Sequence, residues 1–320
     1  MLSTISQHLR NKLKVFFLTD NLVFNNKIIP ITQEHFQEIP SNIEESNLEE
    51  KNIAFIDGGQ AEILSGGNLS LSFIRIFAQV MKGEKKLFSN KYEFYLLTTA
   101  SYKQGDMWYE GKIFPVEGSD LLDENDLIIA STDLSIKSGN ERAPISKVAN
   151  MARRFAELKV ASMITADYIL LDGTLEPTYK NEEKYLSMLG SNVSSIAKSC
   201  SLFTTCGNSP IVLLQKLSPF QSNWSYFIEG NSHFVKLNPK AKHIFRFEGN
   251  KEMLPHLAKN STDSLFLGYP YGLILTDKMA RISNVEKNSL KMNLLLRDEN
   301  KEIVEYLNAM NAHDILDNLG

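Results

Sequence analysis

The sequence is poor in the features that mark specialised classes of protein. Among 320 residues there are only two cysteines, and 34 Lys and Arg stand against 38 Asp and Glu, for a formal net charge of -4. The spacing of Cys200 and Cys206 fits neither a redox Cys-x-x-Cys pair nor a zinc knuckle, so we expect two reduced thiols that pack as small hydrophobes. The charge balance excludes a histone-like protein, although a balanced chain can still gather positive charge in one groove.

Long apolar runs are also missing. No stretch reaches the roughly 18 consecutive apolar residues of a membrane-spanning helix, and the first residues do not form a basic segment followed by an apolar one. We therefore expect a cytoplasmic protein with no membrane contact. Hydrophobic residues make up 43% of the chain, which excludes a disordered protein and supplies the core of one large or two modest domains.

The hydrophobic pattern predicts helical ends around a mixed α/β region. Apolar residues at helical spacing predict a helix over residues 2–17, and an acidic, polar connection follows over 37–51. A buried strand over 52–59 should end in a tight turn at Asp57-Gly58-Gly59. Strands over 69–80 and 92–100 should complete an antiparallel meander, because the connections are too short for crossover helices.

The second half of the chain alternates helix and strand. A helix is expected over 143–162, and a buried strand over 168–173 closes with Asp172-Gly173. Because this strand follows a helix, it should lie parallel to a neighbour. The remaining pattern predicts a helix over 182–198, a strand over 211–216, strands within 224–247 and helices over 282–319. The expected fold is thus a mixed sheet flanked by helices, with helical N- and C-terminal extensions.

Two buried strands that end in Asp-Gly are the sharpest chemical feature. Ligands of an open α/β sheet gather at the carboxyl ends of its strands, so Asp57 and Asp172 could meet there. Two neighbouring carboxylates suit Mg²⁺ or Mn²⁺, which prefer oxygen ligands and relieve the repulsion between the charges. The alternative is structural, because Asp-Gly is also a good turn sequence.

Several segments in this order resemble the NurA nucleases, whose fold is of RNase H type. The resemblance covers most of the chain from about residue 50, and no single motif in it is diagnostic. Its main segments are Ile56-Asp57-Gly58-Gly59, Arg153-Arg154-Phe155-Ala156-Glu157-Leu158 and Leu170-Leu171-Asp172-Gly173-Thr174. Further segments are Ile196-Ala197-Lys198-Ser199, Phe245-Arg246-Phe247-Glu248, Gly268-Tyr269-Pro270-Tyr271 with Thr276-Asp277, and Ala312-His313-Asp314.

The resemblance implies a DNA nuclease that uses Mn²⁺ or Mg²⁺ and acts as a homodimer with a hexameric HerA-type ATPase and translocase. It also implies two regions, an N-terminal helix with its acidic connection over 1–50 and an RNase H-like nuclease domain over 51–320. Asp57, Glu157, Asp172 and His313 would hold the metal. His313 would also orient the water or the phosphate, Lys198 would contact the phosphate, and Asp277 is a weaker acidic candidate.

Each of these roles has a structural alternative. Glu157 lies four residues after Arg153 and can form an exposed helix ion pair. His313 and Lys198 can each complement a helix dipole at a C-terminus. Gly59 stands where many relatives are expected to carry a small hydroxyl residue, so a hydroxyl contribution is in doubt. Finally, the cations and aromatics of 236–246 suit either a DNA groove or a half-exposed hairpin.

Two other functions stay open. An actin-like or sugar-kinase-type phosphotransferase also uses Asp-Gly turns after strands, but it normally needs two similar halves, and the sequence shows no clear duplication. A catalytically inactive adaptor that docks on a translocase and guides DNA is the second alternative. The joint presence of Asp57, Glu157, Asp172 and His313 favours catalysis over it.

Overall fold

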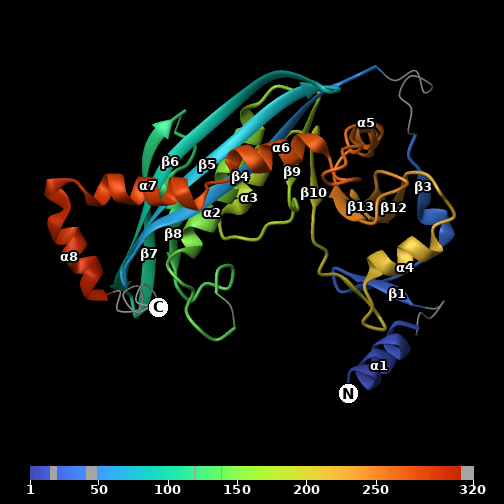
Figure 1. Cartoon of the computed structure of the whole chain (residues 1–320), viewed down its shortest axis with the longest axis horizontal. Coiled ribbons are helices and arrows are strands. Elements are labelled where there is room, and N and C mark those ends of the chain that lie inside the picture. The colour runs from blue at the N-terminus through green and yellow to red at the C-terminus, as the bar shows by residue number, and fades with distance from the viewer. Residues whose placement is uncertain (15–19, 41–48, 119, 138, 311–320) are drawn as a thin grey trace. The chain divides into compact units, whose positions relative to one another are not determined.

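The computed structural model describes residues 1–14, 20–40, 49–118, 120–137 and 139–310 (Figure 1). The chain forms two compact units. Unit 1 comprises Met1–Lys51, Asp172–Thr174 and Ser194–Tyr271, and unit 2 comprises Asn52–Leu171, Leu175–Val193 and Gly272–Gly320. Each unit is thus assembled from separate stretches of chain.

The helices and strands have the following bounds. The strands are β1 (Asn21–Phe24), β2 (Lys27–Pro30), β3 (Phe36–Glu38), β4 (Asn52–Ser65), β5 (Leu69–Lys82), β6 (Lys85–Lys103), β7 (Asp106–Glu117), β8 (Ile128–Ala130), β9 (Tyr168–Asp172), β10 (Val193–Ala197), β11 (Phe203–Thr204), β12 (Trp224–Glu229), β13 (Ser232–Lys236) and β14 (Phe245–Glu248). The α-helices are α1 (Leu2–Lys14), α2 (Lys147–Met163), α3 (Glu182–Leu186), α4 (Pro210–Leu217), α5 (Leu254–Lys259), α6 (Tyr271–Ala280), α7 (Asn284–Leu295) and α8 (Lys301–Met310).

Unit 2 is built on a mixed sheet. Its strands follow the order β9-β4-β5-β6-β7-β8, and β4 to β8 pair antiparallel with their neighbours. β9 pairs parallel with β4, with Ile56 opposite Leu171. Both the antiparallel meander and the parallel strand reached through a helix are therefore confirmed.

The expected turn at Asp57-Gly58-Gly59 is wrong. β4 runs through this sequence to Ser65, and Gly58 and Gly59 pair in register with Ile76 and Arg75 of β5. The glycines serve close packing instead of a turn. A Cβ on Gly58 would lie 2.5 Å from Glu157 Oε1 of α2, and one on Gly59 would lie 2.1 Å from the Ala280 carbonyl oxygen of α6.

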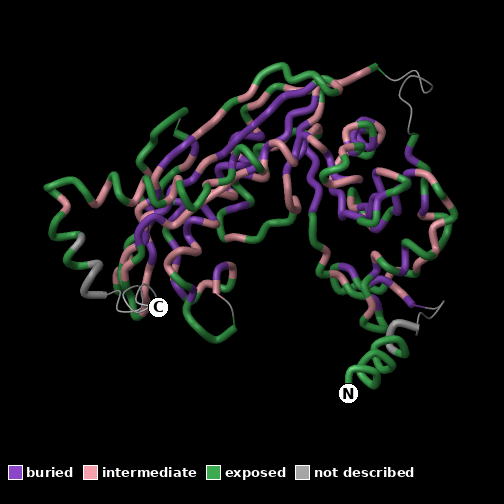
Figure 2. The backbone as a smooth tube through the Cα atoms, in the orientation of Figure 1, coloured by how far each residue is buried: buried purple, intermediate pink, exposed green. Residues whose placement is uncertain are grey.

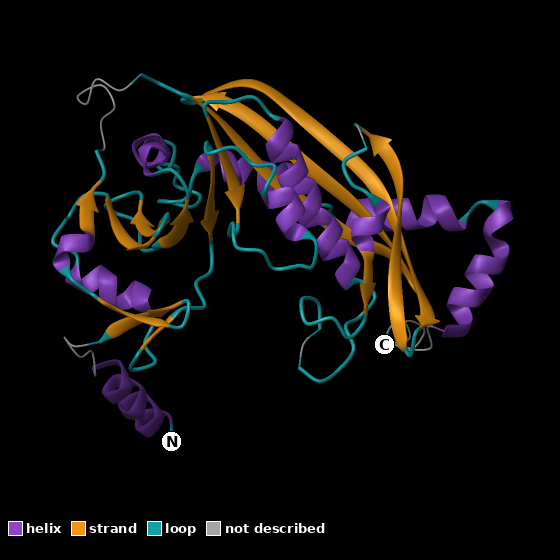
Figure 3. Ribbon diagram, turned by 180° about the vertical axis from the view of Figure 1, so that it is seen from behind, coloured by secondary structure: helices purple, strands orange, loops and turns teal. Residues whose placement is uncertain are grey.

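Helices cover both faces of this sheet (Figure 3). On one face α2 buries Phe155 and Leu158 against Ile56 and Ile76, which belong to the largest core cluster. On the other face, Leu290 of α7 packs in a smaller cluster with other apolar side chains of α7, β4 and β5. Successive residues of a strand point to opposite faces, so Gly58 faces α2 while Asp57 shares the α6 face with Gly59.

Unit 1 has an antiparallel sheet of order β3-β12-β13-β14-β10 and a small sheet of order β11-β1-β2. Its aromatic core includes Trp224, Tyr226 and Phe234, with Phe24 of β1 in the same cluster. The strands expected within 224–247 are present as β12, β13 and β14. In contrast, α1 is exposed throughout the part whose side chains are described (Figure 2).

Two expectations for the second half of the chain are wrong. The helix expected over 182–198 is a short helix, α3, followed by the buried strand β10. The strand expected over 211–216 lies in the helix α4, where Pro210, Leu213 and Leu214 are buried on one side and Pro210 occupies the first turn, as proline readily does. The C-terminal helices are present as α7 and α8, and residues 311–320 lie outside the described part. None of the described helices is long and apolar enough to cross a membrane.

Candidate active site

The parallel strands β4 and β9 set the positions of the two aspartates. Ile56 lies opposite Leu171, and the next residue along each strand is an aspartate, Asp57 in β4 and Asp172 in β9. Asp57 is only 6% exposed, and its Oδ1 accepts a hydrogen bond of 2.7 Å from the Gly58 backbone N–H. The two aspartates thus follow paired residues of adjacent strands, but only Asp172 lies at a strand end as expected, because β4 continues to Ser65.

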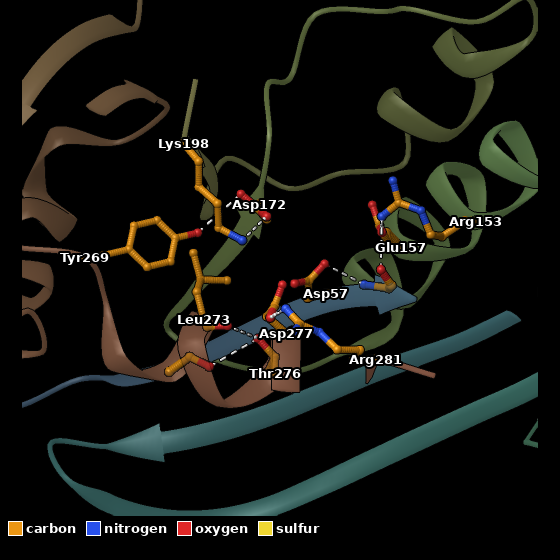
Figure 4. A network of polar contacts seen from close by, with 12 residues as sticks. Asp57, Arg153, Glu157, Asp172, Lys198, Tyr269, Leu273, Thr276, Asp277 and Arg281 are labelled. Atoms are coloured by element: carbon orange, nitrogen blue, oxygen red, sulfur yellow. Dashed lines mark hydrogen bonds and ion pairs between the residues drawn. The ribbon is translucent and has the colours of Figure 1, made fainter. Parts of the chain in front are cut away.

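Glu157 reaches β4 from α2. Its Oε1 accepts a hydrogen bond of 2.5 Å from Arg153, whose guanidinium also donates to the Gly58 carbonyl at 3.1 Å (Figure 4). The ion pair expected as the structural alternative is therefore present. However, the Glu157 side chain is only 5% exposed and that of Arg153 is 32% exposed, so the pair is partly buried and not a fully exposed one.

Asp172 lies in a second polar cluster, within unit 1. Lys198 Nζ lies 2.8 Å from Asp172 Oδ2, and the Tyr269 hydroxyl donates to Asp172 Oδ1 at 3.2 Å (Figure 4). Lys198 was expected to close a helix, which is wrong, because it directly follows β10. Gly173, with φ of 104°, directs the chain out of β9 after Asp172.

Asp277 is placed by α6, a helix that the hydrophobic pattern did not reveal. α6 crosses β4 closely, since a Cβ on Gly272 would lie 2.2 Å from the Phe55 ring and one on Gly59 would meet Ala280. Asp277 lies between these two crossings, on the face of β4 that carries Asp57. Its carboxylate accepts a hydrogen bond of 2.9 Å from Arg281, one turn later (Figure 4). The weakest acidic candidate of the sequence is thus on the helix that covers Asp57.

The metal site predicted from the sequence falls only partly within the described residues. His313 lies outside them, and among them no group of three or more His, Cys, Asp or Glu side chains could hold a metal ion. Glu157, Asp172 and Asp277 are each paired with a cation, namely Arg153, Lys198 and Arg281. Their carboxylate oxygens are nevertheless the donors that Mn²⁺ and Mg²⁺ prefer, so the chemistry of the donor set fits such an ion.

The segment 236–246 is not a row of solvent-facing cations. Lys236 and Arg246 are 7% and 8% exposed, and Arg246 forms an ion pair of 2.7 Å with Glu248. Burial lowers the pKa of Lys236. The exposed basic residues are instead Lys240, Lys242 and His243, which lie in the loop between β13 and β14. Within this segment, the basic side chains that solvent can reach therefore lie in this loop.

Sequence reasoning missed Tyr269 as a part of the site. Tyr269 lies inside the segment Gly268-Tyr269-Pro270-Tyr271, which carries the resemblance, but no spacing reveals its contact with Asp172, which is distant in sequence. The four-residue spacing did indicate the pair of Arg153 with Glu157, but not the hydrogen bond from Arg153 to the Gly58 carbonyl, which depends on the packing of α2 against β4.

In architecture, the chain belongs to the mixed α/β proteins, with a large mixed sheet flanked by helices and an aspartate on each of two parallel strands. No protein-family model matches the chain, and no protein of curated function matches its sequence. Among solved structures it is similar to the NurA nuclease from Sulfolobus solfataricus, with 13% identity, a TM-score of 0.50, and coverage of 92% of this chain and 93% of that one. The chain therefore has a NurA-like nuclease fold.

Endonuclease V structures are also similar, but at lower TM-scores. The enzyme from Ciona intestinalis, in complex with a DNA 24mer, has a TM-score of 0.38 and 14% identity, and the match covers 76% of this chain and 90% of that one. The enzyme from Bacillus subtilis has a TM-score of 0.39 and 12% identity, and the match covers 82% and 90%. These similarities are too distant to bear on the site.

Proposed function

We propose that this chain is a divalent-metal-dependent DNA nuclease that hydrolyses phosphodiester bonds with Mn²⁺ or Mg²⁺. One observation carries the proposal: the register of β4 and β9 gives Asp57 and Asp172 equivalent positions on adjacent parallel strands. The similarity to a NurA nuclease supports the fold in which such a site would work. The oxygen chemistry of the carboxylates supports the choice of metal.

Different residues of the chain have different roles in this proposed site. Asp57 and Asp172 would hold the ion, with Glu157 and His313 as the further ligands expected from the sequence. A bound ion would activate water for attack on the phosphorus and stabilise the leaving oxygen. Tyr269 and Lys198 orient the Asp172 carboxylate, and the half-exposed Lys198 ammonium can exchange that carboxylate for a phosphate oxygen of DNA.

The partners are proposed on the resemblance alone. The proposed partners are DNA as the substrate, a second copy of the chain in a homodimer, and a hexameric HerA-type translocase that acts with the nuclease in DNA end processing. The proposal also keeps the cytoplasmic location expected from the sequence. Co-purification with a HerA-type ATPase and a measurement of mass in solution test the two protein partners separately.

The activity is tested with linear DNA incubated with Mn²⁺, with Mg²⁺ or with chelator. Degradation should require the metal, and Asp57→Asn or Asp172→Asn should reduce it by about a hundredfold or more, because each change removes a charged ligand. Asp298→Asn is the matched control, since the Asp298 side chain is 98% exposed. Full activity of either site variant would refute the assignment of these aspartates.

The inactive adaptor is a second candidate because of two observations. The described residues hold no group of three metal-ligating side chains, and three of the acidic candidates are paired with cations. An adaptor would bind DNA but would degrade none with either metal. The phosphotransferase hypothesis rested on two Asp-Gly turns, and one of them is absent because β4 forms no turn at Asp57. ATP turnover without DNA cleavage would still favour it.

A further inference from the structure

Two loops of unit 1 pack closely against each other beside the Asp172 cluster. They are the loop 237–244 between β13 and β14 and the segment 261–270 that precedes α6. A Cβ on Gly268 would lie 2.4 Å from Ala241 Cβ, and Gly268 has φ of 89°, which favours glycine. Backbone hydrogen bonds from Gly268 to Ser261 and from Ala241 to Asn238 brace the two loops internally. Their side chains are therefore held in a defined arrangement.

Aromatic rings connect these loops to the candidate active site. The Phe266 ring stacks on Tyr269, with centroids 5.1 Å apart and an interplanar angle of 23°. His243 lies edge-on to Phe266 at 5.2 Å, and Phe245 does so at 5.8 Å. Tyr269 and Phe245 are buried, but Phe266 is half-buried and His243 is exposed. The outer members of the cluster are therefore accessible from solvent.

Cations flank this aromatic cluster. Lys198 Nζ lies over the Tyr269 ring at 5.3 Å, and Lys240 and Lys242 are exposed in the same loop as His243. The acidic residue of the two loops is Asp263, whose carboxylate accepts the Leu265 backbone N–H at 2.7 Å. The charge of Lys198 is balanced by Asp172. The two loops themselves carry Lys240 and Lys242 against Asp263, so their charge is positive, and this favours a phosphate-bearing ligand over an acidic peptide.

We propose that Phe266 and His243 form a stacking site for an unpaired DNA base, with Lys198 and Lys242 binding the phosphates of the same strand. The identity of the strand as DNA rests on the proposed nuclease function. Bases inside a duplex are already stacked on both sides, so exposed aromatic rings beside a positive surface select single strands or frayed ends. Tyr269 links this stacking site to Asp172, because it stacks on Phe266 and donates to the carboxylate.

The test is binding of a single-stranded oligonucleotide that contains 2-aminopurine, measured in chelator so that no cleavage occurs. Stacking on an aromatic ring should quench the 2-aminopurine fluorescence. Phe266→Leu keeps an apolar side chain but removes the ring, and it should weaken single-strand binding about tenfold and reduce the quench. Phe266→Trp should restore both. Phe88→Leu, at a 45% exposed phenylalanine of β6, is the matched control and should change neither.

The outcomes separate this proposal from the proposed function. Metal-dependent cleavage with unchanged single-strand binding in Phe266→Leu would overturn the stacking site and leave the nuclease intact. Loss of binding in Phe266→Leu, with no cleavage by the wild-type chain under any metal, would keep the stacking site in a non-catalytic DNA-binding protein. Equal losses for duplex and single-stranded DNA would contradict the choice of an unpaired base. Thermal unfolding of Phe266→Leu checks that the loops still fold.

Discussion

Gly59 illustrates how one missing side chain positions a helix. A Cβ at this residue would lie 2.1 Å from the Ala280 carbonyl oxygen, and that oxygen belongs to the end of α6 and cannot move without shifting the helix. We expect Gly59→Ser, which supplies the hydroxyl anticipated at this position, to lower the free energy of unfolding by about 1–3 kcal/mol through overpacking. Urea unfolding measures this change.

The control for Gly59 is Gly66→Ser. A Cβ on Gly66 would lie 3.3 Å from the flexible Leu69 side chain, so this variant should be nearly neutral. Equal stability of the two variants would show that α6 does not depend on close contact with β4. If only Gly59→Ser is destabilised, the close approach of α6, and not a lost catalytic hydroxyl, explains why glycine occupies position 59.

His233 gives unit 1 a defined pH dependence. Burial, and to a smaller extent the charge of Lys251, lowers the pKa of His233 to about 4 from its ordinary 6.5. The unfolded chain therefore takes up a proton below pH 6.5 that the folded chain refuses. The resulting stability is complete above about pH 6.5 and is lost as the pH falls toward 4, by about 3 kcal/mol in all.

This pH dependence should disappear in His233→Phe. The His233 ring already lies edge-on to Phe227, with centroids 5.5 Å apart, so phenylalanine suits the same position. Urea unfolding at pH 7 and pH 4.5 should give a smaller difference for this variant than for the wild-type chain. His243→Phe is the control, because His243 is exposed. An unchanged pH dependence in His233→Phe would assign the effect to other groups.

At the residue scale, the sequence identified the acidic residues but only one of their partners, Arg153, which pairs with Glu157. Asp57 and Asp172 stand out because an apolar run followed by Asp-Gly is a local feature, although only Asp172 lies at the end of its strand. Lys198 and Tyr269 contact Asp172 from segments far along the chain, and no local pattern encodes such a contact. Only the resemblance drew attention to those segments.

At the element scale, the expected helices and strands were correct where periodicity is strong and wrong where glycine or short length intervenes. The strands of the meander alternate clearly, and α2 has a helical period. The strand over 52–59 was expected to end in a tight turn at Asp57-Gly58-Gly59, because glycine weakens a strand, but here the two glycines allow close packing. The helix α4 has only eight residues, which is too few for the hydrophobic period to distinguish it from a strand.

Arg75 links α7 to the sheet, beside the apolar contacts of that helix. Its guanidinium hydrogen-bonds Glu93 of β6 at 2.5 Å and Glu286 of α7, and it also donates to the Arg281 carbonyl at 3.4 Å. Arg75→Met removes one cation from the 8% exposed Glu93 side chain and leaves it with Lys91, at 3.1 Å. We expect a loss of about 2 kcal/mol and faster hydrogen exchange in α7.

A second substitution tests whether the buried carboxylate causes this loss. Arg75→Met combined with Glu93→Leu removes both charges, so it should recover most of the stability. The control is Lys103→Met, which breaks an exposed pair with Glu110 and should change stability by less than about 0.5 kcal/mol. If the double variant is as unstable as the single one, an uncompensated Glu93 is not the reason.

At the scale of the whole molecule, the chain is divided in a way that composition does not reveal. The expected boundary at residue 50 rests on the acidic connection and stays a prediction. Instead, the chain passes several times between the two units. The stretches Asp172–Thr174 and Ser194–Tyr271 belong to unit 1, and the residues on either side of each stretch belong to unit 2. Such a division follows from tertiary contacts, which no linear pattern of hydrophobicity or charge records.

The proposed metal site makes a prediction for the stability of the whole chain that does not depend on cleavage. A ligand that binds only the folded state stabilises it by mass action, by about 2.7 kcal/mol at a hundred times the dissociation constant. Mn²⁺ should therefore raise the apparent Tm of the wild-type chain by several degrees. Asp57→Asn and Asp172→Asn should each abolish this shift if both carboxylates hold the same ion, while Asp298→Asn should keep it. A shift that survives in one of the two site variants would mean that its aspartate is not a ligand, and the paired register of β4 and β9 would then serve packing alone.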